Sequence, residues 1–476
     1  MDFTTLLNGA GSELFLAIAG LVGLTLGAIF RDSFITLSYR LAAFTLFIAA
    51  FIAVLTYEGG SAFNDLIVSS PFTNYIKIFC YSLAGLALLI SDGFMSRHKT
   101  RRYEYPILFI FSALGMGLIL SSANLMTLYM GIEILGLSSY ILAAFNRDSP
   151  RSSEAGLKYF VLGALASGLL LYGASLIYGY SGSASYRDIA EFASSEDVSV
   201  GFIFGLVLMI SGLAFKVSAA PMHVWTPDVY EGAPTPVVAF FATAPKFAGM
   251  GVFAIILFTV FGSLIEDWQL ILVIIATLSM LIGAFGALAQ TNIKRLLAYS
   301  SIANIGYATI ALSVGMELGA SPLLLFMTIY ALTSLGLFAG VLAMRRSGGM
   351  VEDINELSGL YKAHPGLALG LTLLLVSIAG LPPLGGFWPK LRLLQISIEA
   401  DFLWLAIVLV LSSVIAAAYY LRIIHVIWFK PALEAFEPVD RSVRLIVLVA
   451  SLAAIGFLIW IGQIEALTDA AASSLS

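Results

Sequence analysis

The amino-acid sequence predicts an all-α polytopic membrane protein with about 14 transmembrane helices. Hydrophobic residues make up 60% of the 476 residues, and charged residues make up only 11%. The mean hydropathy is +0.97, a balance that water-soluble globular proteins of this size do not normally show. Apolar stretches of about 20 residues, the length of helix that crosses the hydrocarbon core of a bilayer, recur along the whole chain. We therefore expect the outer surface to face the lipid bilayer or partner subunits.

The predicted spans follow one another with short loops. They lie near residues 12–30, 37–57, 73–92, 105–122, 123–145, 157–178, 201–222, 235–260, 267–289, 295–316, 320–344, 366–397, 401–428 and 442–463. Only the turn Ser121–Asn124 separates the fourth from the fifth. No basic region precedes the first span and no small-residue cleavage site is evident, so we expect this span to stay as a membrane anchor in a bacterial inner membrane.

The charges in the loops predict the orientation. Loops after odd-numbered spans hold Arg31, Arg97, Lys99, Arg101, Arg102, Arg147, Arg151, Lys294, Arg295, Arg345, Arg346, Lys362, Lys430, Arg441 and Arg444. Loops after even-numbered spans hold only Arg187, which has acidic neighbours. The positive-inside rule therefore places the basic loops in the cytoplasm and both termini on the periplasmic side. An error of one span would scramble the alternation, so an even number of spans is indicated.

Prolines at membrane depth predict that two of the spans are broken. The seventh carries Pro221, and the twelfth carries Pro382 and Pro383. A proline lacks the backbone donor that would bond the carbonyl four residues earlier, so the carbonyls of Ile378 and Ala379 must be met by side chains or water. Irregular backbone inside a membrane is tolerated only against protein or a wet cavity, and paired broken helices indicate a transport site between structural repeats.

The broken spans lie five apart, which predicts two five-helix repeats in inverted orientation because five is odd. We expect a single membrane domain over residues 1–476, with a first repeat at 104–260 and a second, inverted repeat at 267–428. The helices of 12–92 and 442–463 flank the repeats. No stretch outside the membrane is long enough to form a second domain.

Four ionisable residues lie inside predicted spans: Glu133, Lys216, Lys246 and Lys390. A charge at the centre of a bilayer costs roughly 2.5–3.5 kcal/mol on insertion scales, so a membrane protein that keeps one generally uses it. Together they suggest a path for protons or small cations. The competing interpretations are a static ion pair between Glu133 and Lys216, and lysines that snorkel to the membrane surface.

The choice of lysine favours proton transfer. Desolvation disfavours the charged form of lysine, so a buried lysine can exchange protons near neutral pH, which a buried arginine cannot do. Glu133 near Lys216 would titrate with it as one unit, and a proton could move the pair between ionised and neutral forms. Lys246 lies about 11 residues from the start of its span, too deep for its side chain to reach a surface easily.

Secondary candidates lie near the cytoplasmic ends of two spans. His223 and Asp228 flank the broken seventh span and could feed protons inward or bond the loop backbone. His425 lies in the thirteenth span, where a helix-end anchor competes with a relay role. Glu154 and Lys158 form an i,i+4 pair that we expect to be structural.

Several function classes are excluded. The only cysteine, Cys80, rules out internal disulfides and cysteine-based metal or iron–sulfur sites. The chain has no phosphate-binding glycine-rich loop, nucleophile elbow or metal-ligand cluster, and no basic stripe that would indicate nucleic acid. We expect no cofactor in this chain.

One long motif resembles a known family. The stretch Ala220-Pro-Met-His-Val-Trp-Thr-Pro-Asp-Val-Tyr-Glu-Gly-Ala-Pro-Thr-Pro-Val237, with Lys216 before it, is similar to the signature of the antiporter-like subunits of respiratory complex I and of the multisubunit cation/proton antiporters. The resemblance covers nearly the whole chain. Lys390 ends the motif Gly380-Leu-Pro-Pro-Leu-Gly-Gly-Phe-Trp-Pro-Lys390, where M-type members usually have glutamate, and the long lateral helix of L-type members is missing. The stretches Ala244–Phe247 and Asn292–Gly306 look like N-type members.

The resemblance implies a role for each buried charge. Glu133 matches the fifth-helix glutamate, Lys216 the seventh-helix lysine, Lys246 the connecting lysine of the eighth helix and Lys390 the terminal lysine of the twelfth. In this family the four form a hydrated axis along the membrane plane, and the whole complex couples NADH oxidation by quinone to proton export. The chain would then translocate protons as part of an NADH–quinone oxidoreductase and perform no redox chemistry itself.

The same resemblance implies partners and leaves alternatives. We expect an M-type antiporter-like subunit and small membrane subunits of the K, J and A types as neighbours, with flavin, iron–sulfur clusters and quinone in other subunits. One alternative is the D-type member of a multisubunit cation/proton antiporter, which would use the same lysines. Another is a purely structural membrane protein, in which neutralising the buried lysines would change only stability.

Overall fold

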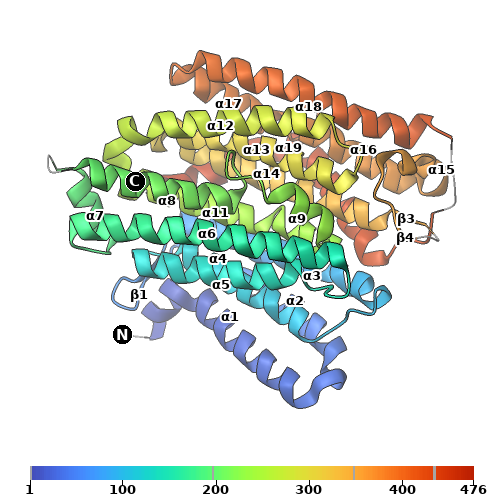
Figure 1. Ribbon diagram of the computed structural model, residues 1–476, viewed down its shortest axis with the longest axis horizontal. Coiled ribbons are helices and arrows are strands. Elements are labelled where there is room, and N and C mark those ends of the chain that lie inside the picture. The colour runs from blue at the N-terminus through green and yellow to red at the C-terminus, as the bar shows by residue number, and fades with distance from the viewer. Residues whose placement is uncertain (1–2, 196–197, 347–348, 432–435, 476) are drawn as a thin grey trace.

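The computed structural model describes residues 3–195, 198–346, 349–431 and 436–475, and it confirms an all-α membrane protein (Figure 1). Fourteen segments correspond one to one to the predicted spans. Their helices are α1 (Phe3–Phe30), α2 (Ile35–Leu55), α3 (Pro71–Arg97), α4 (Glu104–Leu120), α5 (Leu125–Ala143), α6 (Pro150–Ser181), α8 (Val200–Val217), α10 (Thr235–Phe241) with α11 (Ala244–Ile255), α12 (Ile265–Leu288), α13 (Ile293–Ser313), α14 (Met316–Ala343), α16 (Pro365–Ala379) with α17 (Phe387–Glu399), α18 (Leu403–Phe429) and α19 (Arg441–Ala472). Within the described ranges, eleven stretches could cross a membrane by length and hydropathy, one of which holds both α1 and α2, and α4 and α16 are shorter apolar helices.

The remaining elements are short, and most of them lie between the spans. The short helices are η1 (Arg31–Phe34), α7 (Tyr186–Ala193), α9 (Thr226–Gly232), η2 (Ile256–Val260), η3 (Gly262–Leu264), η4 (Ile354–Leu357), α15 (Leu360–Ala363) and η5 (Ser473–Leu475). Two antiparallel hairpins pair β1 (Gly60–Ala62) with β2 (Ile67–Ser69) and β3 (Arg345–Arg346) with β4 (Gly349–Met350).

Local sequence signals account for several helix starts. Ser70 caps α3 in a reciprocal capping box, in which its hydroxyl accepts from Thr73 N at 3.3 Å and Thr73 Oγ1 accepts from Ser70 N at 2.9 Å. Asn124 caps α5 by accepting from Met126 N at 2.8 Å, which fixes the turn between the fourth and fifth spans. These caps satisfy backbone donors that a bilayer cannot satisfy.

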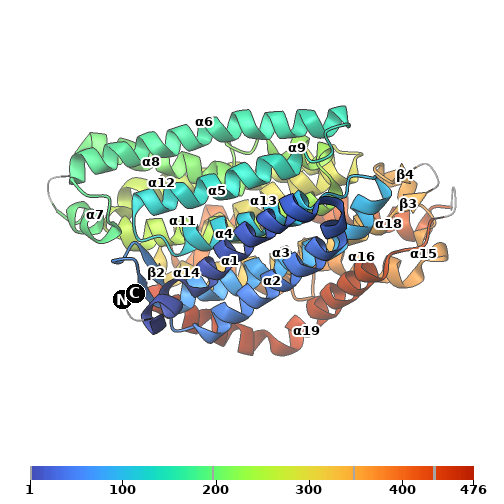
Figure 2. The same ribbon diagram turned by 90° about the horizontal axis from the view of Figure 1, so that it is seen from below.

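Three segments form the centre of the bundle. In the stretches Thr235–Val260, Ile293–Ser313 and Met316–Ala343, 94% of an apolar segment of 18 residues is buried inside the protein. The corresponding share in the α1–α2 stretch is 22%. The two views of the ribbon place α1, α2 and α6 at the periphery (Figures 1 and 2). Small residues allow close helix crossings, as where Gly173 of α6 meets Gly205 of α8. The polar residues of the central segments are therefore shielded from lipid.

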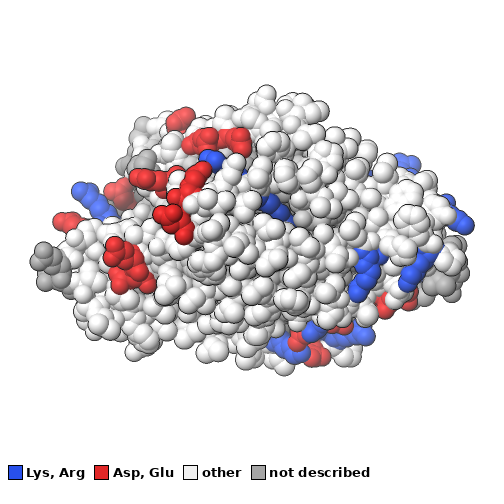
Figure 3. Space-filling model, turned by 90° about the horizontal axis from the view of Figure 1, so that it is seen from above, with Lys and Arg blue, Asp and Glu red and all other residues white. Residues whose placement is uncertain are grey.

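Both chain ends lie at the same end of the bundle (Figures 1 and 2), and the backbone N–H of Phe72 donates to Ser474 Oγ at 3.0 Å. In the space-filling view, most acidic side chains gather toward this end and most Lys and Arg toward the other, and the band between them is uncharged apart from one basic patch (Figure 3). The band is the part that a bilayer would cover.

The helix breaks are more numerous than the sequence predicted. The seventh span ends at Val217, and the twelfth is interrupted between Ala379 and Phe387, as expected. The eighth span is also interrupted, at Ala242 and Thr243, because Pro245 removes a backbone donor and Thr243 adopts a non-helical φ of −122° and ψ of −89°. The two predicted breaks are therefore present, and the break in the eighth span was not predicted.

Candidate functional site

The four predicted charges lie on four different segments of the bundle. Glu133 is on α5, Lys216 is at the end of α8, Lys246 is in the first turns of α11 and Lys390 is at the start of α17. The side chains of Lys246 and Lys390 are 1% and 6% exposed, so neither ammonium snorkels to the surface. Glu133 and Lys216 are half-buried.

Lys216 reaches α5 at a point where that helix has no side chain. A Cβ on Gly136 would lie 3.2 Å from Lys216 Nζ, so the glycine opens the space that the ammonium occupies. Lys216 Nζ donates to Tyr140 Oη at 3.3 Å and lies 5.7 Å from the centroid of the Tyr140 ring. Glu133 lies on the same face of α5, two turns before Tyr140, and Lys216 lies beside the helix between them.

Glu133 and Lys216 are not in direct contact. Both side chains are described, yet no ion pair joins them, and Glu133 Oε1 is buried without a protein hydrogen-bond partner. The two groups are close enough to interact electrostatically. This geometry differs from a static ion pair, because Lys216 contacts Tyr140 and forms no ion pair with the Glu133 carboxylate.

The loop after Lys216 is held by side chains. Ser218 adopts a left-handed φ of 65°, and the backbone N–H of Ala220 donates to Ser279 Oγ at 2.7 Å. Trp225 Nε1 donates to the carbonyl of Phe215 at 3.1 Å. These contacts satisfy backbone groups that the break in the seventh span would otherwise leave unpaired at membrane depth.

Lys246 is connected to α13 and α14 by hydroxyl groups. Its Nζ donates to Ser301 Oγ at 2.6 Å, and Ser301 Oγ lies 2.5 Å from Tyr330 Oη. Nζ also lies 5.4 Å from the centroid of the Tyr230 ring. The ammonium is therefore the first group of a buried hydrogen-bonded chain that ends at Tyr330.

Lys390 fills the break in the twelfth span. Its Nζ donates to the carbonyls of Ile378 at 3.1 Å and Ala379 at 3.0 Å, and it lies 4.7 Å from the centroid of the Tyr307 ring. The expectation that these two carbonyls need a side-chain or water partner is confirmed, and the partner is the buried lysine itself. Tyr330 and Lys390 line a common cavity of about 10 Å³, which is room for one water molecule.

Aromatic rings fill the space between Lys216 and Lys246. Ring centroids lie 4.8 Å apart for Tyr140 and Tyr159, 4.3 Å for Tyr159 and Trp225, and 6.4 Å for Trp225 and Tyr230. Three buried hydroxyls in this region have no protein partner among the described residues: those of Ser218, Thr226 and Tyr230. Buried polar groups of this kind are usually met by water.

The secondary candidates are not gathered at one place. Asp228 belongs to an ion network at the basic-loop end, where it pairs with Lys158 and Arg295, both at 2.7 Å. The predicted pair of Glu154 and Lys158 is confirmed at 2.7 Å, and Arg295 also pairs with Glu231 at 3.0 Å. Partial burial of Asp228 opposes these contacts, but the hydrogen bonds from Lys158 and Arg295 hold the pKa of its carboxyl below the usual value.

The two histidines differ in their surroundings. His223 is half-buried in the loop after α8, with Nδ1 lacking a protein partner, and burial lowers the pKa of its imidazole against a backbone hydrogen bond at Pro221 that raises it. His425 is exposed on α18 and stacks on Phe429 with ring centroids 5.4 Å apart. Its place on the outside of α18 separates it from the buried lysines.

A fully buried ion pair was not predicted. Glu13 of α1 and Lys77 of α3 form an ion pair at 2.7 Å, and their side chains are 3% and 1% exposed. Lys77 Nζ also donates to Ser69 Oγ at 2.8 Å, and Ser121 Oγ donates to Glu13 Oε1 at 3.1 Å. Both charges lie inside predicted apolar spans, which is the signal that identified the other four and could have found these.

The chain offers little to a metal ion. No group of three His, Cys, Asp or Glu side chains that could hold one is found in the described ranges. Cys80 is fully buried, and its Sγ donates to the carbonyl of Ala244 at 3.3 Å.

The chain is similar to proteins of a known family. Residues 122–416 match the family model described as NADH:quinone oxidoreductase/Mrp antiporter, TM. The chain is 51% identical to NADH-quinone oxidoreductase subunit N of Hirschia baltica, covering 100% of both chains, and 47% identical to subunit N of Maricaulis maris, covering 93% of this chain and 92% of that one.

Solved structures resemble it as well. A chain of respiratory complex I from Thermus thermophilus with bound aureothin has a TM-score of 0.82 at 29% identity, covering 96% of this chain and 98% of that one. A chain of the Mrp complex from Dietzia sp. has a TM-score of 0.84 at 21% identity, covering 100% of this chain and 98% of that one, which shows a shared fold.

Proposed function

Because the chain belongs to the NADH:quinone oxidoreductase/Mrp antiporter family of membrane proteins, we propose that it moves protons along a buried path through Glu133, Lys216, Lys246 and Lys390. It is a multi-pass membrane subunit of a multisubunit respiratory complex, and its relatives of 41–51% identity are subunit N of NADH-quinone oxidoreductase. This identity favours the oxidoreductase over the cation/proton antiporter, for which the likeness to the Dietzia structure is one of fold.

The connection between Lys246 and Lys390 carries this proposal. Lys246 bonds Ser301, Ser301 bonds Tyr330, and Tyr330 shares a cavity with Lys390. Lys246, Ser301 and Tyr330 can each give and accept a proton, and the cavity beside Lys390 can hold a water molecule that does the same. A proton leaving one lysine can therefore reach the other without crossing apolar space.

Movement of Glu133 would set the direction. When the carboxylate approaches Lys216 it stabilises the ammonium, and when it withdraws the proton is released toward the hydroxyls of Thr226 and Tyr230. Lys216 then contacts Tyr140, as in the geometry described above. Lys246 receives the proton, and Lys390 passes it on after exchanging its carbonyl partners for water.

The complex and the compartment follow from the same proposal. We expect an M-type antiporter-like subunit and K-, J- and A-type small subunits beside this chain, with flavin, iron–sulfur clusters and quinone held by other subunits. The basic loops would face the cytoplasm of a bacterium and both termini the periplasm. His223 and the Asp228 network would lie at the cytoplasmic entrance, with His425 as an outer, secondary group.

Proton uptake by inverted membrane vesicles tests the proposal. Replacement of Lys246 by methionine, which keeps the length and removes the charge, should abolish most NADH-driven proton uptake in vesicles with a normal content of assembled complex. The matched control is Lys362→Met, because Lys362 is an exposed lysine at the basic-loop end. Full proton uptake with Lys246→Met would refute a path through this residue.

A further inference from the structure

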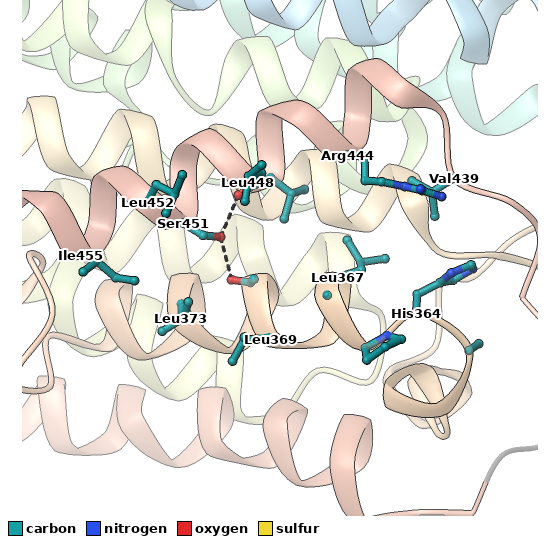
Figure 4. A pocket seen from close by; sticks show the side chains of 15 residues that line it. His364, Leu367, Leu369, Leu373, Val439, Arg444, Leu448, Ser451, Leu452 and Ile455 are labelled. Atoms are coloured by element: carbon teal, nitrogen blue, oxygen red, sulfur yellow. Dashed lines mark hydrogen bonds between the residues drawn. The ribbon is translucent and has the colours of Figure 1, made fainter.

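A long apolar groove runs between α16 and α19 on the outside of the bundle (Figure 4). Its volume is about 590 Å³, and its walls are mainly aliphatic side chains, with Leu369 and Leu373 on α16 and Leu448, Leu452 and Ile455 on α19. Leu369, Leu448 and Leu452 are more than half exposed, at 52%, 54% and 57%. No part of the proposed proton path uses this groove.

The floor of the groove is fixed by one contact between the two helices. Ser451 Oγ donates to the carbonyl of Val447 at 2.7 Å and to that of Gly370 at 3.2 Å, the two dashed lines of Figure 4. A Cβ on Gly370 would lie 2.9 Å from Val447 Cγ1, so only glycine lets the helices meet here. The groove is therefore a preformed feature of the fold.

One end of the groove is basic. His364 and Arg444 line it at the basic-loop end, and both are labelled in Figure 4. The nearby acidic residues are already paired, Asp440 with Arg97 at 2.7 Å and Glu437 with Arg345. Arg444 is exposed and has no ion-pair partner in the described part of the chain, so its charge is open to an anion.

The length of the groove matches one leaflet of a bilayer. From Arg444 to Ile455 the helix α19 rises by about 16 Å at about 1.5 Å per residue. Half of a hydrocarbon core of about 30 Å is about 15 Å. The charge thus lies at the level of lipid headgroups when the aliphatic walls lie in the hydrocarbon.

We propose that the α16–α19 groove binds a phospholipid, with its phosphate at Arg444 and His364 and one acyl chain along Leu448, Leu452 and Ile455. Arginine matches phosphate through paired N–H donors. His364 Nε2 lies 3.1 Å from the carbonyl oxygen of Glu437, so His364 offers only Nδ1 to the phosphate. The bound chain would pack against α16, whose last carbonyls hold Lys390. The inference rests on the groove alone and does not depend on the proposed proton path.

Photo-crosslinking in the assembled complex tests the lipid. A benzophenone-bearing amino acid replaces Leu452, the complex is irradiated in native membranes and purified, and the mass of the adduct on this chain is measured. A phospholipid adduct is expected, and Arg444→Gln should lower its yield about tenfold, because the loss of a hydrogen bond to a charged group commonly weakens binding by about this factor. Arg441→Gln is the matched control, because Arg441 is an exposed arginine one turn earlier that does not line the groove.

A second variant fills the groove. Gly366 lines it, and a Cβ there would meet nothing within 4 Å, so Gly366→Leu adds an apolar side chain whose Cβ has room at the wall of the groove. It should lower the adduct yield as Arg444→Gln does. An adduct with a neighbouring polypeptide or a quinone would overturn the proposal. A phospholipid adduct whose yield is unchanged by both Arg444→Gln and Gly366→Leu would also overturn it, because it would indicate only bulk lipid.

Discussion

Lys390 Nζ donates a hydrogen bond of 3.0 Å to the carbonyl of Ala379, the last residue of α16, from the first turn of α17. The lysine thus satisfies backbone oxygens that the prolines of the twelfth span leave free, and the break and the buried charge depend on each other. When Lys390 gives up its proton, its hydrogen bonds to these two carbonyls are no longer strengthened by the positive charge, so its protonation is coupled to the shape of the break.

Gly380→Ala should impair this coupling. Gly380 has a φ of +78°, and an added Cβ would lie 2.5 Å from Lys390 Cδ. The backbone strain costs on the order of 1–3 kcal/mol, and the clash displaces the lysine from its carbonyls. We expect reduced proton pumping per assembled complex, measured as proton uptake per NADH oxidised.

Gly182 provides the control for that experiment. It has a φ of +72°, but a Cβ there would meet nothing within 4 Å. Gly182→Ala therefore imposes the same backbone strain without touching a charge. Equal loss of pumping in both variants would show that strain alone, and not the contact with Lys390, accounts for the effect of Gly380→Ala.

Tyr330→Phe should slow proton transfer by about tenfold or more, because the hydroxyl joins Ser301 to the cavity of Lys390 and positioned proton-transfer groups commonly contribute at least this factor. The ring and its packing remain. NADH-driven proton uptake measures the effect. Tyr75→Phe is the matched control, since Tyr75 is a buried tyrosine whose hydroxyl bonds Thr328, outside the chain from Lys246 to Lys390. Normal pumping with Tyr330→Phe would remove this hydroxyl from the path.

The burial of two of the candidate lysines was predictable from the sequence, but the contacts of the candidate residues were not. A lysine inside an apolar span is visible in the sequence, and Lys246 and Lys390 proved to be buried. The partners Tyr140 and Ser301 could not be foreseen, because tyrosine and serine are unremarkable in a membrane helix and only the packing of α5 and α13 brings them to the lysines. Glu13 was overlooked although it obeys the same rule.

Lys77→Met should destabilise the protein without blocking proton transfer. It leaves Glu13 buried and unpaired, which costs about 3–5 kcal/mol, whereas the double variant Glu13→Gln with Lys77→Met should recover most of that loss. Thermal unfolding of the purified complex gives the comparison. A double variant as unstable as Lys77→Met would contradict a simple ion pair, and loss of pumping at normal complex content would place the pair on the proton path.

Asp228→Asn should destabilise the basic-loop end in a pH-dependent manner. The pKa of Asp228 is lowered in the folded protein, so its contribution to stability is present above its unfolded pKa of about 3.9 and is lost as the pH falls through the lower folded value. We expect about 0.2–1 kcal/mol for each of its two ion pairs at neutral pH. The difference in unfolding temperature between wild type and variant should shrink toward zero in acid; a constant difference would contradict this origin.

The number and approximate positions of the spans were predictable, because apolar stretches long enough to cross a bilayer are visible in the sequence. The breaks at Pro221 and at Pro382 were visible, whereas the break at Thr243 was missed because Pro245 falls in the first turn of α11, where proline is also a normal helix start. The inverted relation of the two repeats, 104–260 and 267–428, stays a prediction. The α16–α19 groove has no sequence signature, since it arises from where two helices diverge.

The number of protons moved per NADH oxidised by the assembled Lys216→Ala complex tests the central claim most directly. Removing the ammonium leaves Glu133 without its partner charge and Tyr140 without its donor. Most coupled pumping should be lost while the complex still assembles and is purified with its other subunits. An assembled Lys216→Ala complex that pumps as many protons per NADH as the wild type would contradict the account.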